Sequence, residues 1–173
     1  MKFVSVAGAA LAAWLGSSAA AAPLDYDCDT AAGSYSMIDL VQPGPGYRIR
    51  GTVTGVQFRK DDRWLPTATI ALVSADKSNF VSVQLMRHAR DSKMELAANG
   101  LLRGERRSAE GGRVGLGEAV PFEITSGGGR TVVQFGEKRT IFDFDPGADA
   151  RVKVSCSTGQ FRFEGLDWEA PAR

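Results

Sequence analysis

The chain has 173 residues, of which 43% are hydrophobic and 24% are charged, and its 21 Lys and Arg residues nearly balance 20 Asp and Glu residues. This balance argues against general nucleic-acid binding, which requires net neutralisation of phosphates, and it provides no polybasic signal for a membrane surface. The length is sufficient for one domain that buries a large apolar core.

The N-terminus predicts a secretory signal peptide. Lys2 supplies a positive charge, Phe3 to Leu15 form an apolar run, and residues 16–22 are small and offer several A-x-A cleavage sites. The apolar run is too short to span a bilayer, and no cysteine follows the predicted cut directly to carry a lipid. We therefore expect residues 1–22 to be removed and residues 23–173 to form one β-sandwich domain, secreted or periplasmic, with no membrane anchor.

Cys28 and Cys156 are the only two cysteines. In an exported protein such a pair predicts one disulfide, which would hold an N-terminal segment beside a strand near the C-terminus. Two unpaired thiols are the alternative. Two cysteines and one histidine are too few for a zinc site, so we expect no metal there.

Tyr47 to Phe58 predicts a long strand, because its apolar and polar residues alternate. The alternation changes parity after Gly55, where we expect a β-bulge. Arg59 to Pro66 reads as a charged loop that carries Trp64, and Thr67 to Ser74 predicts the next strand.

Phe80 to Ala98 predicts a β-hairpin. Pairing Leu85 with Met94 places apolar residues opposite one another on one face of both strands. The same register places Gln84 opposite Glu95 on the other, mostly polar face, as a half-buried pair of strands requires.

Phe122 to Phe144 predicts a three-stranded meander. Gly136 begins a two-residue turn that pairs Val133 with Thr140, and the preceding glycine-rich turn pairs Phe122 with Val133. One face of this meander has mixed polar and apolar residues. The other face is predicted to line the core and consists of Phe122, Ile124, Val133, Phe135, Phe142 and Phe144.

About ten short strands separated by turns, without an internal repeat or an amphipathic helix, predict an all-β fold of two packed antiparallel sheets. The segment FEITSGGGRTVVQFGEKRTIFDF and the closing segment STGQFRFEGLDW resemble the concanavalin A-like lectin and glucanase superfamily. The resemblance implies a two-sheet jelly roll with adjacent terminal strands, whose concave face binds glycans and in some members cleaves them. The glucanases of that family carry acids in an E-x-D-x-E pattern, whereas the nearest segment here, KMELAA, has Glu95 alone.

Five residues are candidate ligand contacts, namely Trp64, Gln84, Arg87, His88 and Glu95. Trp64 can stack on a sugar ring or fold back onto the edge of the sandwich. Arg87 and His88 can hold an anionic sugar or keep a hairpin tip soluble. Glu95 is a candidate catalytic acid, but glycoside hydrolysis needs a second carboxylate, for which only Glu123 is a candidate.

We expect no cofactor, with calcium as the alternative, because some members of the family bind calcium. Two groups of aspartates could supply oxygen ligands, although Asp-Pro-Gly in the second group is a turn sequence in its own right and turn chemistry is the favoured interpretation. The groups are Asp25, Asp27 and Asp29, and Asp143, Asp145 and Asp149.

These features favour an exported, soluble, non-catalytic protein that binds a glycan or another small ligand and no nucleic acid. A polysaccharide hydrolase or lyase that uses Glu95 is the second hypothesis. A structural or protein-interaction module of the cell envelope is the third.

Overall fold

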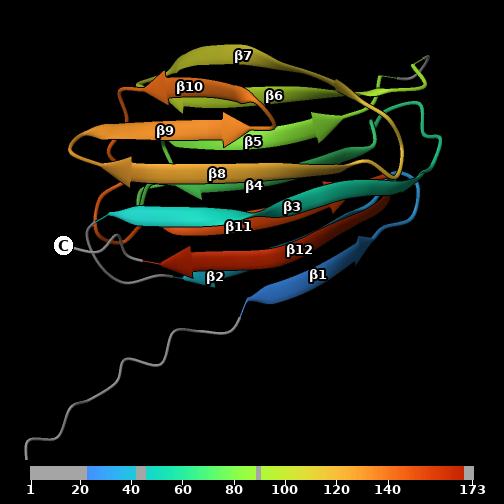
Figure 1. Ribbon diagram of the computed structural model, residues 1–173, viewed down its shortest axis with the longest axis horizontal. Helices are drawn as coiled ribbons and strands as arrows, with labels where there is room; N and C mark the ends of the chain where they lie inside the picture. Colours follow the sequence, from blue (N-terminus) through green and yellow to red (C-terminus); the bar gives the residue numbers. More distant parts are fainter. Residues whose placement is uncertain (1–22, 42–45, 89–90, 170–173) are drawn as a thin grey trace, which may run out of the picture.

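The computed structural model describes residues 23–41, 46–88 and 91–169; the predicted signal peptide lies outside these residues. The described part of the chain forms twelve strands and no helix, so the all-β prediction is confirmed. Two antiparallel sheets of six strands each pack face to face (Figure 1), as the resemblance implied. Within the same residues, no helix has the length and apolar character to cross a membrane.

The strand order brings the two ends of the chain together in one sheet. Sheet A consists, in order, of β1 (Leu24–Asp29), β12 (Gly159–Glu169), β3 (Tyr47–Phe58), β8 (Ala119–Gly127), β9 (Arg130–Phe135) and β10 (Lys138–Phe142). Sheet B consists of β2 (Tyr35–Val41), β11 (Arg151–Ser157), β4 (Thr67–Val73), β5 (Phe80–Met86), β6 (Met94–Leu102) and β7 (Glu105–Val114). The neighbouring positions of β1 and β12 are visible in Figure 1.

The core lies between the sheets and is built by alternate residues of each strand. Phe161 and Phe163 of β12 and Val53 of β3 are fully buried. Full burial of such a side chain contributes about 1.5–3 kcal/mol to the free energy of unfolding. All six residues of the meander that we predicted to face the core are buried, so that assignment is confirmed.

The predicted bulge in β3 is present. Gln57 pairs with Gln160 and Gly55 pairs with Phe161, which leaves Val56 as the extra residue of β3. Gly55 leaves room for the Met94 side chain, because a Cβ at this position would lie 2.6 Å from the Met94 Sδ atom and the methionine would have to move. The alternation of the sequence therefore located both the strand and its irregularity.

Two predicted registers were wrong by two residues. Leu85 pairs with Leu96 rather than Met94, and Phe122 pairs with Phe135 rather than Val133. A shift of two residues leaves every side chain on its predicted face, because the side-chain period of a strand is two.

The predicted disulfide between Cys28 and Cys156 is confirmed, with a Cα–Cα distance of 6.1 Å. Cys28 belongs to β1 in sheet A and Cys156 to β11 in sheet B. The bond therefore links the two sheets as well as the two ends of the chain. A disulfide is typical of proteins in an oxidising environment.

Candidate functional site

The outer face of sheet B carries a groove with a floor of small polar side chains. Ser155, Thr69 and Gln84 are paired neighbours in one row across β11, β4 and β5. Two adjoining hollows, of about 300 and 460 Å³, share Thr69, and we call them together the sheet B groove. The rest of its lining includes Tyr35, Trp64, Thr67, Ser157, Phe80, Ser82, Asn99, Arg106, Arg107 and Ser108.

An exposed aromatic pair, Tyr35 and Trp64, forms one end of the groove. The ring centroids are 6.1 Å apart and the ring planes are inclined by 15°. The residues remain 63% and 40% exposed. Contiguous exposed apolar surface often marks a binding site on a soluble protein. Trp64 thus packs on Tyr35 and still presents surface to solvent.

The loop before β4 holds Trp64 in place. One carboxylate oxygen of Asp61 accepts hydrogen bonds from the backbone N–H groups of Arg63 and Trp64, each at 2.9 Å. This side-chain turn is typical of aspartate. The Ser157 hydroxyl donates to the Leu65 carbonyl oxygen at 2.9 Å and ties the loop to β11. The position of Trp64 is therefore fixed before any ligand arrives.

A chain of hydrogen bonds orients the amide of Gln84. The Ser108 hydroxyl donates to Asn99 Oδ1 at 2.7 Å, and Asn99 Nδ2 donates to Gln84 Oε1 at 3.1 Å. Because Oε1 accepts this bond, the Gln84 NH₂ group is directed away from Asn99. Thr69 is the neighbour of Gln84 in the adjacent strand. An amide donor and a hydroxyl thus stand side by side on the groove floor.

His88 and Glu95 form a hydrogen-bonded pair beyond this floor. His88 Nε2 lies 3.0 Å from Glu95 Oε2. Glu95 pairs with Met86 rather than with Gln84, so Glu95 and Gln84 are diagonal neighbours on the same face. Four inter-strand spacings separate Tyr35 on β2 from Glu95 on β6, which is about 19 Å across the sheet.

The comparisons with known proteins give the fold a family context. Neither a family model nor a curated protein matches the sequence. An alginate lyase from Alteromonas sp. 272 superposes with a TM-score of 0.59 at 9% identity, over 75% of this chain and 73% of that one. The carbohydrate-binding module CBM66 from Bacillus subtilis superposes with a TM-score of 0.51 at 10% identity, over 83% and 86%.

A polysaccharide lyase of family 18 superposes with a TM-score of 0.57 at 8% identity, over 75% of this chain and 74% of that chain. The structural neighbours are jelly-roll sandwich proteins, which is consistent with the fold of the concanavalin A-like lectin and glucanase superfamily. At these identities the likeness shows the fold alone and defines no subfamily.

Arg87, predicted as a ligand contact, does not line the sheet B groove. Its guanidinium carbon lies 4.8 Å from the ring centroid of Phe58 on β3, and its Nε donates to the Asp91 carbonyl oxygen at 2.6 Å. Glu123 is also remote from the groove, because it lies on β8 of sheet A and pairs with Arg48. Glu95 and Glu123 face opposite sides of the sandwich and do not flank a common bond.

The aspartates considered for calcium have separate partners. Asp25 accepts the Gly165 N–H, Asp27 accepts the Gln160 amide, and Asp29 pairs with Arg59. No group of three or more His, Cys, Asp or Glu residues in the described ranges is placed to hold a metal ion. Calcium binding by this chain stays a prediction.

Tyr35 is one of the groove residues that the sequence reasoning missed. The segment around it was not recognised as a strand, although Ile38 and Leu40 alternate with Met37 and Asp39 in β2. That alternation was the available signal. Its meaning depends on Trp64, which is distant in sequence and becomes a neighbour only in the folded sandwich.

Proposed function

We propose that this protein binds a carbohydrate chain in the sheet B groove, without cleaving it. The observation that carries the proposal is the exposed Tyr35–Trp64 pair at the end of a groove with a hydroxyl and amide floor. Sugar rings present an apolar face to aromatic side chains and hydroxyl groups to polar ones. The fold supports the proposal, because one structural neighbour is named as a carbohydrate-binding module.

The groove is held ready for a ligand. Asp61 and Ser157 fix the loop of Trp64, and Asn99 fixes the Gln84 amide. Groups that are ordered before binding lose little conformational entropy when the ligand arrives. We therefore expect the groove to bind an oligosaccharide with little rearrangement of the backbone.

The end of the groove opposite the aromatic pair is basic. Arg106 and Arg107 of β7 belong to its lining; Arg107 pairs with Glu105 at 3.4 Å, whereas no ion pair involves Arg106 in the described residues. Arginine binds carboxylates by charge-assisted hydrogen bonds. An acidic polysaccharide such as alginate is therefore the first ligand to test.

Isothermal titration calorimetry of the purified protein with acidic and neutral oligosaccharides tests the proposal. We expect binding, with an affinity that falls at least about tenfold in Trp64→Ala, because the ring loses its stacking contact with the sugar. Leu116→Ala is the matched control, since Leu116 is 51% exposed but lies outside the groove. No binding of any oligosaccharide, or equal losses in both variants, would contradict the proposal.

A lyase is the second candidate, and the His88–Glu95 pair favours it. With the Glu95 carboxylate accepting a hydrogen bond from Nε2–H, Nδ1 of His88 is the ring nitrogen that can take a proton from the carbon beside a uronate carboxyl group. Alginate lyases are among the structural neighbours. Unsaturated product formed from alginate, and lost in His88→Gln with binding retained, would establish this activity in place of a non-catalytic role.

We also propose that the protein acts outside the cytosol. The Cys28–Cys156 disulfide supports this location, together with the leader predicted over residues 1–22. Fractionation of the producing cells, with antibody detection of the mature protein, tests it; a cytosolic protein that keeps its N-terminal residues would contradict it.

A further inference from the structure

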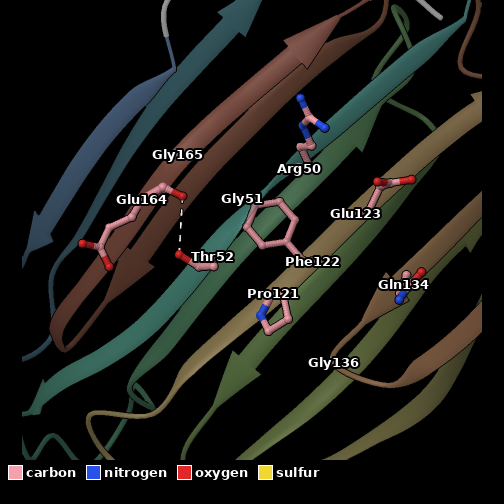
Figure 2. Close-up of a pocket in the computed structure, with 10 residues that line it drawn as sticks. All are labelled: Arg50, Gly51, Thr52, Pro121, Phe122, Glu123, Gln134, Gly136, Glu164 and Gly165. Atoms are coloured by element: carbon pink, nitrogen blue, oxygen red, sulfur yellow. Dashed lines mark hydrogen bonds between the residues drawn. The ribbon is translucent and has the colours of Figure 1, made fainter.

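A larger hollow lies on the opposite side of the sandwich, on the outer face of sheet A. Its volume is about 570 Å³, which is within the range of small-molecule sites. We call it the sheet A pocket; its lining includes Arg50, Thr52, Pro121, Phe122, Gln134 and Glu164. Figure 2 shows Glu164 on one side and Gln134 on the other, with the ring of Phe122 between them.

Glycines create this pocket. Gly51 of β3 and Gly165 of β12 belong to its lining and carry no side chain that would fill it. Gly165 has a φ of +61° and lies in a bulge that interrupts the pairing of β12 with β3. A Cβ at Gly51 would lie 3.0 Å from the Glu164 carbonyl oxygen and 3.3 Å from the Phe122 ring. The floor is thus backbone with an apolar ring directly below.

The charges around the pocket leave one carboxylate unmatched. Arg50 donates two hydrogen bonds to one oxygen of Asp167, at 2.7 and 3.0 Å. Arg48 pairs with Glu123 at 2.9 Å. Within the described residues, no hydrogen bond or ion pair involves the Glu164 carboxylate. Two further arginines lie on this face: Arg162 is opposite Asp27 of β1, and Arg139 is opposite Gln134 at the other side of the pocket. At the edge formed by β12, Glu164 therefore presents a carboxylate without a partner among the described residues, which favours a cation over an anion at that edge.

The carboxylate of Asp25 adds to the preference for a cation at this edge of the pocket. Asp25 of β1 accepts the backbone N–H of Gly165 at 2.8 Å, so its negative charge lies beside the bulge next to Glu164. Pro121 and Phe122 contribute apolar surface, while the Thr52 hydroxyl and the Gln134 amide contribute hydrogen-bonding groups. An apolar floor with a few convergent polar groups is the usual composition of a small-molecule site.

We propose that the sheet A pocket binds a small organic amine, with its apolar body over Pro121 and Phe122 and its ammonium group at Glu164. This site is separate from the sheet B groove, because the two open on opposite faces of the sandwich. The protein would accordingly hold two ligands of different chemistry, and binding at one face does not require the other.

Three probes of similar shape and different charge test the proposal. Benzylamine, benzyl alcohol and benzoate are titrated into the ¹⁵N-labelled protein, and backbone chemical shifts are followed by NMR. We expect benzylamine to shift the resonances of Gly51, Thr52 and Gly165, with an affinity up to about fivefold above that of benzyl alcohol, as an exposed ion pair allows. Benzoate should bind most weakly.

Glu164→Gln should remove the preference for benzylamine over benzyl alcohol, whereas Glu110→Gln should retain it. Glu110 is an exposed glutamate on β7 of sheet B, so its replacement changes the net charge equally. The proposal is overturned if benzylamine shifts no pocket resonance, if benzoate binds best, or if the preference survives in Glu164→Gln. None of these outcomes bears on glycan binding in the sheet B groove.

Discussion

The two outer faces of this sandwich differ far more than the two inner faces. Cross-strand ion pairs cover the outer face of sheet A, as Arg48 pairs with Glu123 and Arg50 with Asp167. The centre of the sheet B face instead carries hydroxyl and amide side chains beside exposed aromatic rings. The inner faces are mostly apolar because the fold requires burial there, and the buried hydroxyl groups of Ser126 and Thr131 are hydrogen-bonded. The outer faces are free to vary, so functional differences accumulate on them.

Ion pairs and small polar side chains have different roles on the outer faces of the sandwich. Exposed ion pairs contribute about 0–1 kcal/mol each to stability and mainly keep a surface soluble. In sheet B, the ion pairs of Arg151 with Asp39 and of Arg113 with Asp91 involve no residue of the groove lining, whereas Arg107 of the lining pairs with Glu105 at 3.4 Å. Within the described residues, ion pairing in the groove is therefore confined to its β7 end, and a ligand on the hydroxyl and amide floor does not have to displace an ion pair.

Removing the disulfide that links the two sheets should have the largest effect on stability. Replacing both Cys28 and Cys156 by serine removes a bond that closes a loop of 128 residues between β1 and β11. We expect a loss of about 3 kcal/mol in the free energy of unfolding and a fall of about 10 °C in the melting temperature. Calorimetric melting with and without a reductant provides the check. Equal melting temperatures of the oxidised and reduced protein would contradict the prediction.

The limits of prediction from sequence are clearest in the strand registers. Alternation in β5 and β6 assigned Leu85 and Leu96 to the core, because parity follows directly from the period of two. The alternation does not determine the offset between strands, so Leu85 was paired with Met94 instead of Leu96. Where a tight turn sets the offset, as Gly136 does, the predicted pair of Val133 with Thr140 is observed.

Introducing a large side chain on the outer face of sheet B or of sheet A tests which of the two faces binds the glycan. Thr69 is shared by both hollows of the sheet B groove, so Thr69→Arg should lower glycan affinity at least about tenfold, or 1.4 kcal/mol. Thr52→Arg makes the same change on β3 of sheet A and should leave glycan affinity unchanged. Calorimetric titration distinguishes them; equal losses in both variants would mean that the glycan site is not confined to sheet B.

Only some residues of the candidate site could be predicted from the sequence. Gln84 and Glu95 were assigned to one polar face by the hairpin pattern, and the structure places them there as diagonal neighbours. Trp64 was selected because a large aromatic in a polar loop is unusual. Its partner Tyr35 lies on β2, at the opposite edge of sheet B from β7, and only the strand order brings such residues together. Contacts of this kind arise from topology, which local patterns do not encode.

The connection where the chain passes from sheet B to sheet A offers a stabilising change. Thr158 is fully buried, and within the described residues its hydroxyl has no hydrogen-bond partner. Thr158→Val keeps the branched shape and removes the unsatisfied group, so we expect a gain of about 1 kcal/mol in the free energy of unfolding. Thr30→Val is the control, because the Thr30 hydroxyl bonds the Gly159 carbonyl at 3.1 Å and its loss should destabilise. Denaturant melts that show both variants destabilised would contradict this account.

The ion pairs of sheet A should prove weak when measured individually. Arg50 and Asp167 are joined at 2.7 Å, but their side chains are 48% and 23% exposed. A double-mutant cycle with alanine at both positions should give a coupling of about 0.5 kcal/mol, reduced by added salt. A coupling well above 1 kcal/mol that is independent of salt would show that sheet A depends on this pair for stability.

The smallest expected effect concerns the turn between β4 and β5. The Asp76 carboxylate accepts hydrogen bonds from the Ser74 hydroxyl at 2.5 Å and the Ser78 hydroxyl at 2.6 Å, followed by the Ser78 N–H at 3.0 Å. These bonds lower the pKa of Asp76 from 3.8 to about 2. Since the unfolded chain has the higher pKa, it binds the proton first as the pH falls.

This turn therefore stabilises the fold fully above about pH 4, and the contribution is lost as the pH falls through 2. Melting temperatures recorded from pH 6 to pH 2 should fall more steeply for the wild type than for Asp76→Asn, whose side chain does not titrate. Asp62→Asn serves as the control, because no hydrogen bond or ion pair involves the exposed Asp62 carboxylate in the described ranges. Parallel profiles for wild type and Asp76→Asn would show that the hydrogen-bonded turn persists in the unfolded chain, since only a difference between the two states makes stability depend on pH.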